Sequence, residues 1–117
     1  MADDKIETIV SRSSGTLGRA VSEARGVHLA LDSSTHPKLD ALTNSEAFLA
    51  GVSSCGVTLI EMHAQQSGVP LRRMEVEIEG VRAAAEPSRF SSVTMRFALA
   101  GVSQAQAEDL VRTYQGR

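Results

Sequence analysis

The stretch Thr43-Asn44-Ser45-Glu46-Ala47-Phe48-Leu49-Ala50-Gly51-Val52-Ser53-Ser54-Cys55-Gly56-Val57-Thr58-Leu59-Ile60 decides the fold of this chain. Its opening has the Thr-x-x-Glu spacing of a capping box, in which the side chains of Thr43 and Glu46 each satisfy a backbone N–H group of the other residue. The 14 residues from Ala47 to Ile60 carry no charge. Such a run is too short for a bilayer span of about 20 residues and is typical of a core helix buried on most sides.

The spacing of apolar residues predicts which side of this helix is buried. Large apolar residues recur at 4-3-4-3 spacing and form one stripe, at Phe48, Val52, Cys55, Leu59 and Met62. Small residues lie between them and allow another backbone to approach closely, at Ala50, Gly51, Ser53, Ser54 and Gly56. Gly68 followed by Pro70 predicts that the helix ends near Ser67.

Strands are expected before the helix. Residues 5–12 are rich in β-branched side chains and end at a Ser-Ser-Gly turn signal, and residues 17–22 are a further candidate. Residues 26–32 alternate in polarity, which predicts a strand with one buried face and one open face. The buried face would carry Val27, Leu29 and Leu31, and the open face His28, Ala30 and Asp32. Residues 33–40 have no period and indicate a loop.

Two strands and a second helix are expected after the central helix. Apolar residues alternate with glutamates over residues 74–79 and with polar or small residues over residues 93–100, so these segments predict a pair of half-buried strands. Ser103 and Gln106 repeat the capping-box spacing before an apolar stripe that reaches Tyr114. The order of elements predicts an α+β fold with antiparallel strands around a long buried central helix.

Composition limits the functional classes. The chain has 117 residues, 42% of them apolar, and a net charge of −2, which suits a single domain over residues 1–117. The sequence offers no basic stripe for nucleic acid, no membrane span and no basic-then-apolar export signal, so a cytoplasmic location is expected. The single cysteine, Cys55, excludes a disulfide or a multi-cysteine zinc site within these residues.

Few side chains in this sequence are candidates for catalysis or metal binding. Spacing alone favours Cys55 as a small buried packing residue, and a reactive thiol there would need a cation from another element because the helix supplies none. Glu46 precedes Cys55 by nine residues, which places it on the opposite side of a regular helix. The three histidines have no metal-ligand spacing, so we expect no metal and no cofactor; they are His28, His36 and His63.

The segment Asn44-Ser-Glu-Ala-Phe-Leu-Ala-Gly-Val-Ser-Ser-Cys55-Gly, with Gly68-Val-Pro-Leu and Val76-Glu-Ile-Glu-Gly80 after it, resembles the OsmC/Ohr family. The resemblance runs from Gly26 onward and implies the OsmC-like fold of an intertwined homodimer. It also implies a thiol peroxidase that reduces small organic hydroperoxides, with Cys55 as the nucleophile that passes through a sulfenic acid. Family members activate this thiol with a glutamate and an arginine.

The resemblance implies Glu46 as that glutamate, although its register fits a structural glutamate equally well. It implies Arg19 as the arginine, with Arg12 as a rival. The family places a resolving cysteine after its last helix, whereas this sequence stops at Arg117. We therefore expect either a truncated sequence or a cycle completed by an external thiol.

Two further hypotheses stay open beside the peroxidase. One is a redox-inactive OsmC-like dimer that binds small apolar ligands at its interface, and the other is a protein in which Cys55 serves packing alone. Packing independently predicts an obligate homodimer, because a helix apolar on nearly all sides needs more cover than one short chain offers. The expected contact with the partner helix is formed by the small residues Ala50, Gly51, Ser54 and Gly56.

Overall fold

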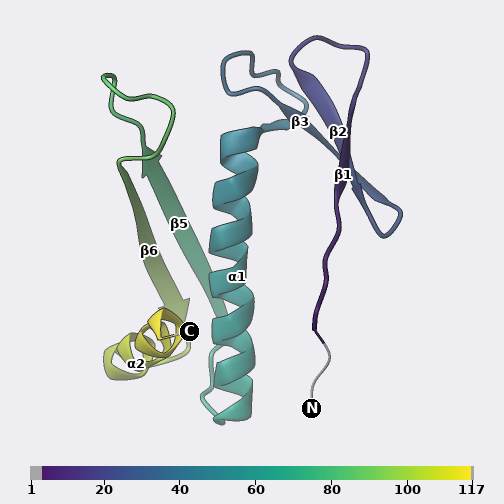
Figure 1. The fold of residues 1–117 in the computed structure, drawn as a ribbon. Helices are drawn as coiled ribbons and strands as arrows, with labels where there is room; N and C mark the ends of the chain where they lie inside the picture. The colour runs from purple at the N-terminus through teal and green to yellow at the C-terminus, as the bar shows by residue number, and fades with distance from the viewer. Residues whose placement is uncertain (1–3, 117) are drawn as a thin grey trace. The chain divides into compact units, whose positions relative to one another are not determined.

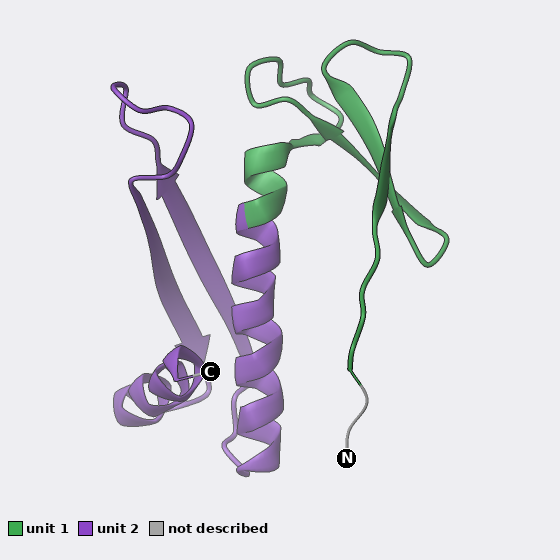
Figure 2. Ribbon diagram, viewed as in Figure 1, with its two compact units in different colours: residues 1–48 green, residues 49–117 purple. Residues whose placement is uncertain are grey.

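A computed structural model describes residues 4–116 of the chain. Residues 1–3, which belong to the acidic start that argued against export, and Arg117, the expected cut end of the last helix, lie outside the described residues. The chain divides into two compact units, residues 1–48 and residues 49–117 (Figure 2). With two helices and two sheets in the described residues, the predicted α+β class is confirmed.

The first unit contains a four-stranded sheet in the order β1-β2-β3-β4 (Figure 1). The strands are β1 (Val10–Ser13), β2 (Arg19–Ala24), β3 (Val27–Asp32) and β4 (Leu42–Thr43). The first three pair antiparallel, whereas β4 pairs with β3 in parallel. The predicted loop is confirmed between β3 and β4, and it returns the chain to the sheet directly before the central helix.

The first strand, β1, is shorter than the strand predicted over residues 5–12. Its register places Val10 opposite Glu23, which leaves a single residue of β2, Ala24, before the turn at Arg25 and Gly26. Residues 5–8 therefore extend past the end of the neighbouring strand, where it offers no residue for ladder hydrogen bonds. Their β-branched composition alone does not make them a strand.

The polarity expected for β3 is wrong in this chain. Val27 and Leu29, predicted on the buried face, are 62% and 51% exposed, whereas Asp32, predicted on the open face, is fully buried. Burial of Asp32 is possible because its carboxylate accepts hydrogen bonds from Arg19 and from the backbone N–H group of Lys38. Alternation predicts the two faces of a strand but does not identify the face that the rest of the unit covers.

The central helix, α1 (Asn44–Gln66), begins and ends where the sequence predicts. The capping box is present: the Thr43 N–H group donates to Oε1 of Glu46 at 2.9 Å, and the Glu46 N–H group donates to the Thr43 hydroxyl at 3.2 Å. At the other end, Gly68 adopts a left-handed conformation with φ of 70°, which glycine accommodates without strain. The following residue, Val69, donates its N–H group to the carbonyl of Ala64.

The second unit packs α1 against a β-hairpin and a short helix (Figure 1). Strands β5 (Arg73–Val81) and β6 (Ser92–Ala100) pair antiparallel, as predicted, and Arg96 lies opposite Glu77 with a 2.9 Å ion pair. The predicted capping box at Ser103 and Gln106 opens α2 (Gln104–Gln115). The core joins Ile60 and Ala64 of α1 to Leu110 of α2, and its partly buried neighbours include Met74, Phe97, Leu99, Val111 and Tyr114.

One side of α1 is covered in this chain, and it is not the predicted stripe. The buried positions are Gly56, Ile60 and Ala64, spaced four residues apart, whereas Phe48 and Met62 of the predicted stripe are 58% and 55% exposed. Gly56 faces its own chain, since a Cβ atom there would lie 3.4 Å from Met95 Cε and Tyr114 Cζ. The close approach expected from a partner helix is thus made at Gly56 by β6 and α2.

The length of α1 does not distinguish it from a membrane-spanning helix. Within the described part of the chain, this 23-residue helix is long and apolar enough to cross a bilayer, and 17% of its most apolar window is buried. The 14 charge-free residues from Ala47 to Ile60 are only part of this helix. A soluble core helix has the same length and composition, but its apolar side chains must then be covered by protein.

Candidate functional site

Cys55 lies in the middle of α1 with an exposed side chain. The expectation of a buried packing residue is therefore wrong for this chain. Cys55 directly precedes Gly56, and one residue turns a helix by about 100°, so the thiol points away from the covered side. Among the described residues 49–116, the thiol makes no hydrogen bond.

Glu46 is part of the helix cap. Its Oε1 atom accepts the N–H group of Thr43, and the residue as a whole is exposed at the first turn of α1. This contact occupies one carboxylate oxygen and orients the side chain back toward the start of the helix. A structural role for Glu46 is thus present in the geometry.

Arg19 lies at the start of β2 and forms two bidentate ion pairs. Its Nε and Nη2 atoms donate to the two oxygens of Asp32 at 2.7 and 3.1 Å. Its Nη1 and Nη2 atoms donate to the two oxygens of Asp40 at 3.1 and 2.5 Å. Four of the five N–H groups of a guanidinium are thereby used.

The two carboxylates differ in environment. Asp32 is fully buried on β3, where the Lys38 N–H group adds a third hydrogen bond at 3.2 Å, whereas the Asp40 side chain is 72% exposed in the loop before β4. Hydrogen bonds from Arg19, which itself is 17% exposed, lower the pKa of both carboxyl groups below the ordinary value. The hydrogen bond with Asp32, and after it the hydrogen bond with Asp40, raise the pKa of Arg19, so the guanidinium stays charged at any working pH.

Arg12, the rival of Arg19, lies on β1. It pairs with Glu23 of β2 at 3.3 Å, and its side chain is 64% exposed. This is a surface pair on a short strand, and such pairs contribute about 0 to 1 kcal/mol. Arg12 is the more weakly held of the two arginines.

The sequence analysis did not connect Asp32 and Asp40 with Arg19. The structure brings both of them to Arg19 within the first unit. Alternation had assigned Asp32 to an open face, and Asp40 fell in a loop without period. No spacing signal could have found them, because Asp32 is 13 residues and Asp40 is 21 residues from Arg19 along the chain.

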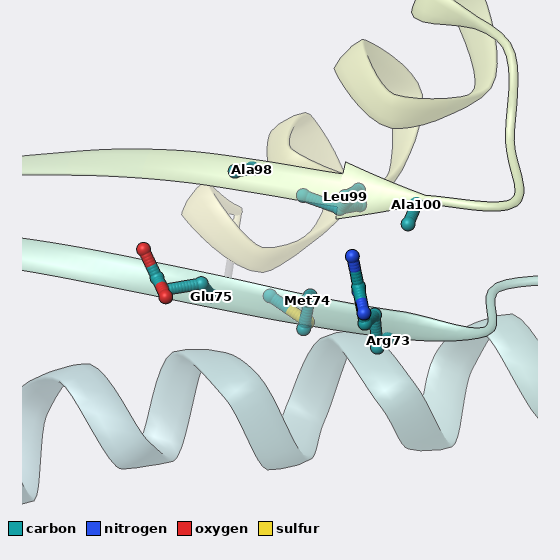
Figure 3. A pocket seen from close by; sticks show the side chains of 6 residues that line it. All are labelled: Arg73, Met74, Glu75, Ala98, Leu99 and Ala100. Atoms are coloured by element: carbon teal, nitrogen blue, oxygen red, sulfur yellow. The ribbon is translucent and has the colours of Figure 1, made fainter.

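A cavity in the described part of the second unit is lined by none of the predicted site residues. The face of the β5–β6 hairpin holds a cavity of about 420 Å³ lined by Arg73, Met74, Glu75, Ala98, Leu99 and Ala100 (Figure 3). Arg73 and Glu75 supply its charged groups, and it has no nucleophilic side chain. Among residues 4–116, no group of three or more His, Cys, Asp or Glu side chains could hold a metal ion.

Comparison with known proteins identifies the fold and the family. The sequence model of the OsmC family, described as OsmC-like protein, matches residues 36–117. This match covers more than half of the chain and includes the loop with Asp40, all of α1 and the whole second unit. No protein with curated annotation matches the sequence at a significant level.

Several solved structures share the fold. The crystal structure of an OsmC-like protein from Mycoplasma pneumoniae superposes with a TM-score of 0.84 and 14% identity over 98% of this chain and 84% of that one. An organic hydroperoxide resistance protein OsmC from Legionella pneumophila superposes with a TM-score of 0.70 and 20% identity, over 95% of this chain and 82% of that one. An organic hydroperoxide resistance protein from Elizabethkingia anophelis superposes with a TM-score of 0.72 and 15% identity, over 96% of this chain and 82% of that one. At these identities the likeness establishes the OsmC-like fold.

Proposed function

This chain belongs to the OsmC family, and from that premise we propose that it is a thiol-dependent peroxidase that reduces organic hydroperoxides through Cys55. The observation that carries the proposal is the exposed thiol of the chain's single cysteine on the central helix of this fold. Two of the similar structures are organic hydroperoxide resistance proteins, which supports the choice of substrate class. A small hydroperoxide can reach an exposed sulfur, whereas a packed cysteine would be inert.

The reaction needs no metal or cofactor. The thiolate sulfur of Cys55 attacks the terminal oxygen of R–O–O–H, so that an S–O bond forms while the O–O bond breaks. The electron pair of the broken bond leaves with the alkoxide, which takes up a proton and becomes the alcohol. The sulfur is oxidised to a sulfenic acid while the peroxide is reduced.

An external thiol closes the cycle. One thiol condenses with the sulfenic acid, releasing water and forming a mixed disulfide with Cys55. A second thiol attacks the external sulfur of that disulfide, which frees the Cys55 thiol and releases an oxidised disulfide. Within the sequence given there is no second cysteine to take the place of the first external thiol.

Activation of the thiol is assigned to an arginine and to Glu46. We propose Arg19 over Arg12 because two carboxylates fix the position of the Arg19 guanidinium, whereas Arg12 is an exposed residue with one surface ion pair. A guanidinium beside the sulfur would favour the thiolate and stabilise the leaving alkoxide. Glu46 would act through its second carboxylate oxygen, since Oε1 is engaged in the helix cap.

The working unit is proposed to be a cytoplasmic homodimer of one OsmC-like domain, residues 1–117. The family match supports a single domain because it runs across the boundary between the two compact units. Exposed apolar side chains support the dimer, since a second copy would cover Phe48 and Met62 on α1 and Val27 and Leu29 on β3. Sedimentation equilibrium tests this assembly, and a stable folded monomer at micromolar concentration would contradict it.

The decisive experiment for the chemistry is intact mass spectrometry. One equivalent of cumene hydroperoxide should add one oxygen to the wild-type chain, and dithiothreitol should remove it. Cys55→Ser should gain no reducible oxygen and should lose hydroperoxide consumption, because methionine oxidation is not reversed by a thiol alone. Hydroperoxide consumption retained by Cys55→Ser would end the peroxidase proposal.

A second candidate is a redox-inactive dimer that binds small apolar ligands at its interface. The same exposed apolar side chains favour it. Under this candidate, cumene hydroperoxide and the corresponding alcohol would bind equally well without oxidising Cys55. The mass experiment therefore separates the two candidates.

A further inference from the structure

Arg73 and Glu75 lie on the outer face of the β5–β6 hairpin, the face that points away from the core. Met74, between them, packs against the core, and successive side chains of a strand point to opposite faces. Both charged residues are exposed, and Figure 3 shows their side chains extending from β5 on the same side. About 7 Å separates their Cα atoms, since a strand rises about 3.4 Å per residue.

The register of the hairpin leaves these two charges without partners across the strands. Glu77, the next residue on the outer face, lies opposite Arg96 and pairs with it at 2.9 Å. The residues opposite Arg73 and Glu75 are both alanines, which offer no charge. Among the ion pairs of residues 4–116, none includes Arg73 or Glu75, so the two side chains do not neutralise each other either.

The same two alanines, Ala98 and Ala100, leave space between the charged side chains. Their methyl groups are short, and the cavity of about 420 Å³ in Figure 3 opens beside them. This volume lies within the range of about 300 to 1,000 Å³ that is typical of small-molecule sites. An adjoining cavity of about 260 Å³ shares Arg73 and Ala100 and adds Arg72. Along β5, cations therefore line one end of the cavity and the carboxylate of Glu75 lines the other.

We propose that this cavity on the outer face binds a small zwitterion, in chemical class a free amino acid. The guanidinium of Arg73 donates to the ligand carboxylate, and the carboxylate of Glu75 accepts from the ligand ammonium group. The apolar side chain of the ligand lies against the methyl groups of Ala98 and Ala100. A simple anion would be repelled by Glu75 and a simple cation by Arg73, so the pair selects a ligand that carries both charges.

A surface without a ligand predicts different behaviour. If Arg73 and Glu75 are only solvated charges, no zwitterion should bind saturably and their substitution should change nothing that can be titrated. The site lies entirely within the second unit and uses neither Cys55 nor its chemistry. The outcome of the hydroperoxide experiments therefore has no bearing on it.

The test is a titration of the full chain with L-leucine, followed through the backbone amide signals in NMR spectra. Two analogues each lack one of the charges: 4-methylpentanoate has no ammonium group, and 3-methylbutylamine has no carboxylate. We expect leucine to shift the signals of residues 73–75 and 98–100 saturably. Each analogue should bind about fivefold more weakly or worse, because one charged group of the site then has no partner.

Variants of the charged residues test their roles. Arg73→Gln and Glu75→Gln should each weaken leucine binding by about fivefold or more. The matched control is Glu79→Gln, which neutralises another exposed glutamate on the same face of β5, outside the cavity. It should bind leucine as the wild-type chain does.

A further pair of variants tests the cavity while both charges are kept. Ala98→Leu places a larger side chain in the cavity and should abolish leucine binding, whereas the exposed outer face accommodates its bulk without disturbing the core. Thr94→Leu adds similar bulk on the same face of β6, outside the cavity, and should leave leucine binding unchanged.

Each result decides for or against the site. Saturable leucine binding that is weakened by Arg73→Gln, Glu75→Gln and Ala98→Leu, and by neither control, supports it. Absence of saturable shifts in the wild-type chain overturns it. An analogue with one charge that binds as tightly as leucine overturns the selection of a zwitterion. Leucine affinity that survives Ala98→Leu, or that falls equally in Glu79→Gln, overturns the location of the site.

Discussion

Thr43 and Glu46 close the N-terminus of α1 reciprocally, each accepting a hydrogen bond from the backbone N–H group of the other, at 3.2 and 2.9 Å respectively. Thr43 is the last residue of the two-residue strand β4 and Glu46 lies in the first turn of α1, so this cap joins the sheet of the first unit to the central helix. The contact gives Glu46 a structural role that is independent of any chemistry at Cys55. It also allows the two roles to be separated experimentally.

We predict that Glu46→Gln keeps the fold and tests the chemistry. Glutamine fits the third helical position of a capping box as well as glutamate does, so the free energy of unfolding should change by no more than a few tenths of a kcal/mol. Loss of hydroperoxide reduction in this variant would assign a catalytic role to the carboxylate charge. Retained reduction would contradict that role and leave Glu46 as a cap residue.

The cap itself is tested by Thr43→Ala. Removing the hydroxyl leaves the Glu46 N–H group without its acceptor, and loss of such a cap lowers the free energy of unfolding by about 0.5 to 2 kcal/mol. Urea unfolding followed by circular dichroism measures the change. Thr43→Ser, which retains the hydroxyl, is the matched control and should stay close to wild type.

The turn between β2 and β3 predicts a stabilising substitution. Arg25 and Gly26 form a two-residue hairpin loop with φ values of 54° and 80°, both in the left-handed region. Arginine is disfavoured there, whereas asparagine followed by glycine is the preferred pair for such a turn. Arg25→Asn should raise the free energy of unfolding by up to about 1 kcal/mol. A urea midpoint of Arg25→Asn no higher than that of the control Arg25→Ala would contradict this reading of the turn.

Substitutions at two glycines of α1 test the stability of the fold and the formation of the dimer separately. Gly56 is packed against Met95 and Tyr114, so Gly56→Leu should lower the free energy of unfolding by about 1 to 3 kcal/mol through overpacking. A Cβ atom at Gly51 has nothing within 4 Å in this chain, so Gly51→Leu should leave the fold of each unit intact. If a second copy packs there, Gly51→Leu should instead weaken the dimer in sedimentation equilibrium.

The alanine variants are the controls for both glycines. Gly56→Ala places its Cβ atom at ordinary contact distance, 3.4 Å, and gains helix propensity of about 1 kcal/mol, so it should not be destabilised. Gly51→Ala should be stabilised in the same way. A Gly51→Leu protein with an unchanged association constant would contradict a partner contact at this position.

Much of the fold is predictable because its signals are local. The Thr43-to-Glu46 and Ser103-to-Gln106 spacings each lie within one helical turn, and the alternation over β5 and β6 lies within single strands. The covered face of α1 was not predictable, because every side of this helix is apolar or small and the choice depends on where β6 and α2 pack. Burial of Asp32 escaped prediction for a similar reason, since it depends on Arg19, which is distant in the sequence.

The ion pairs of Arg19 with Asp32 and Asp40 predict how stability depends on pH. Hydrogen bonds and charge attraction from Arg19 lower the pKa values of Asp32 and Asp40 below 3.8, so in acid the unfolded chain binds more protons than the folded chain. The stabilisation is fully present above about pH 4 and is lost as the pH falls through the lowered values. Arg19, with its raised pKa, stays protonated throughout this range and adds no slope of its own.

Urea unfolding between about pH 2 and pH 6 measures this slope. We expect Asp40→Asn to unfold with a shallower loss of stability in acid than wild type, because one of the two linked carboxyl groups is gone. Asp32→Asn should remove the other linked carboxyl group, and it should also be less stable at neutral pH, since the guanidinium loses its buried partner. If Asp40→Asn follows the wild-type pH profile in parallel, the exposed carboxylate does not pair with Arg19 in solution.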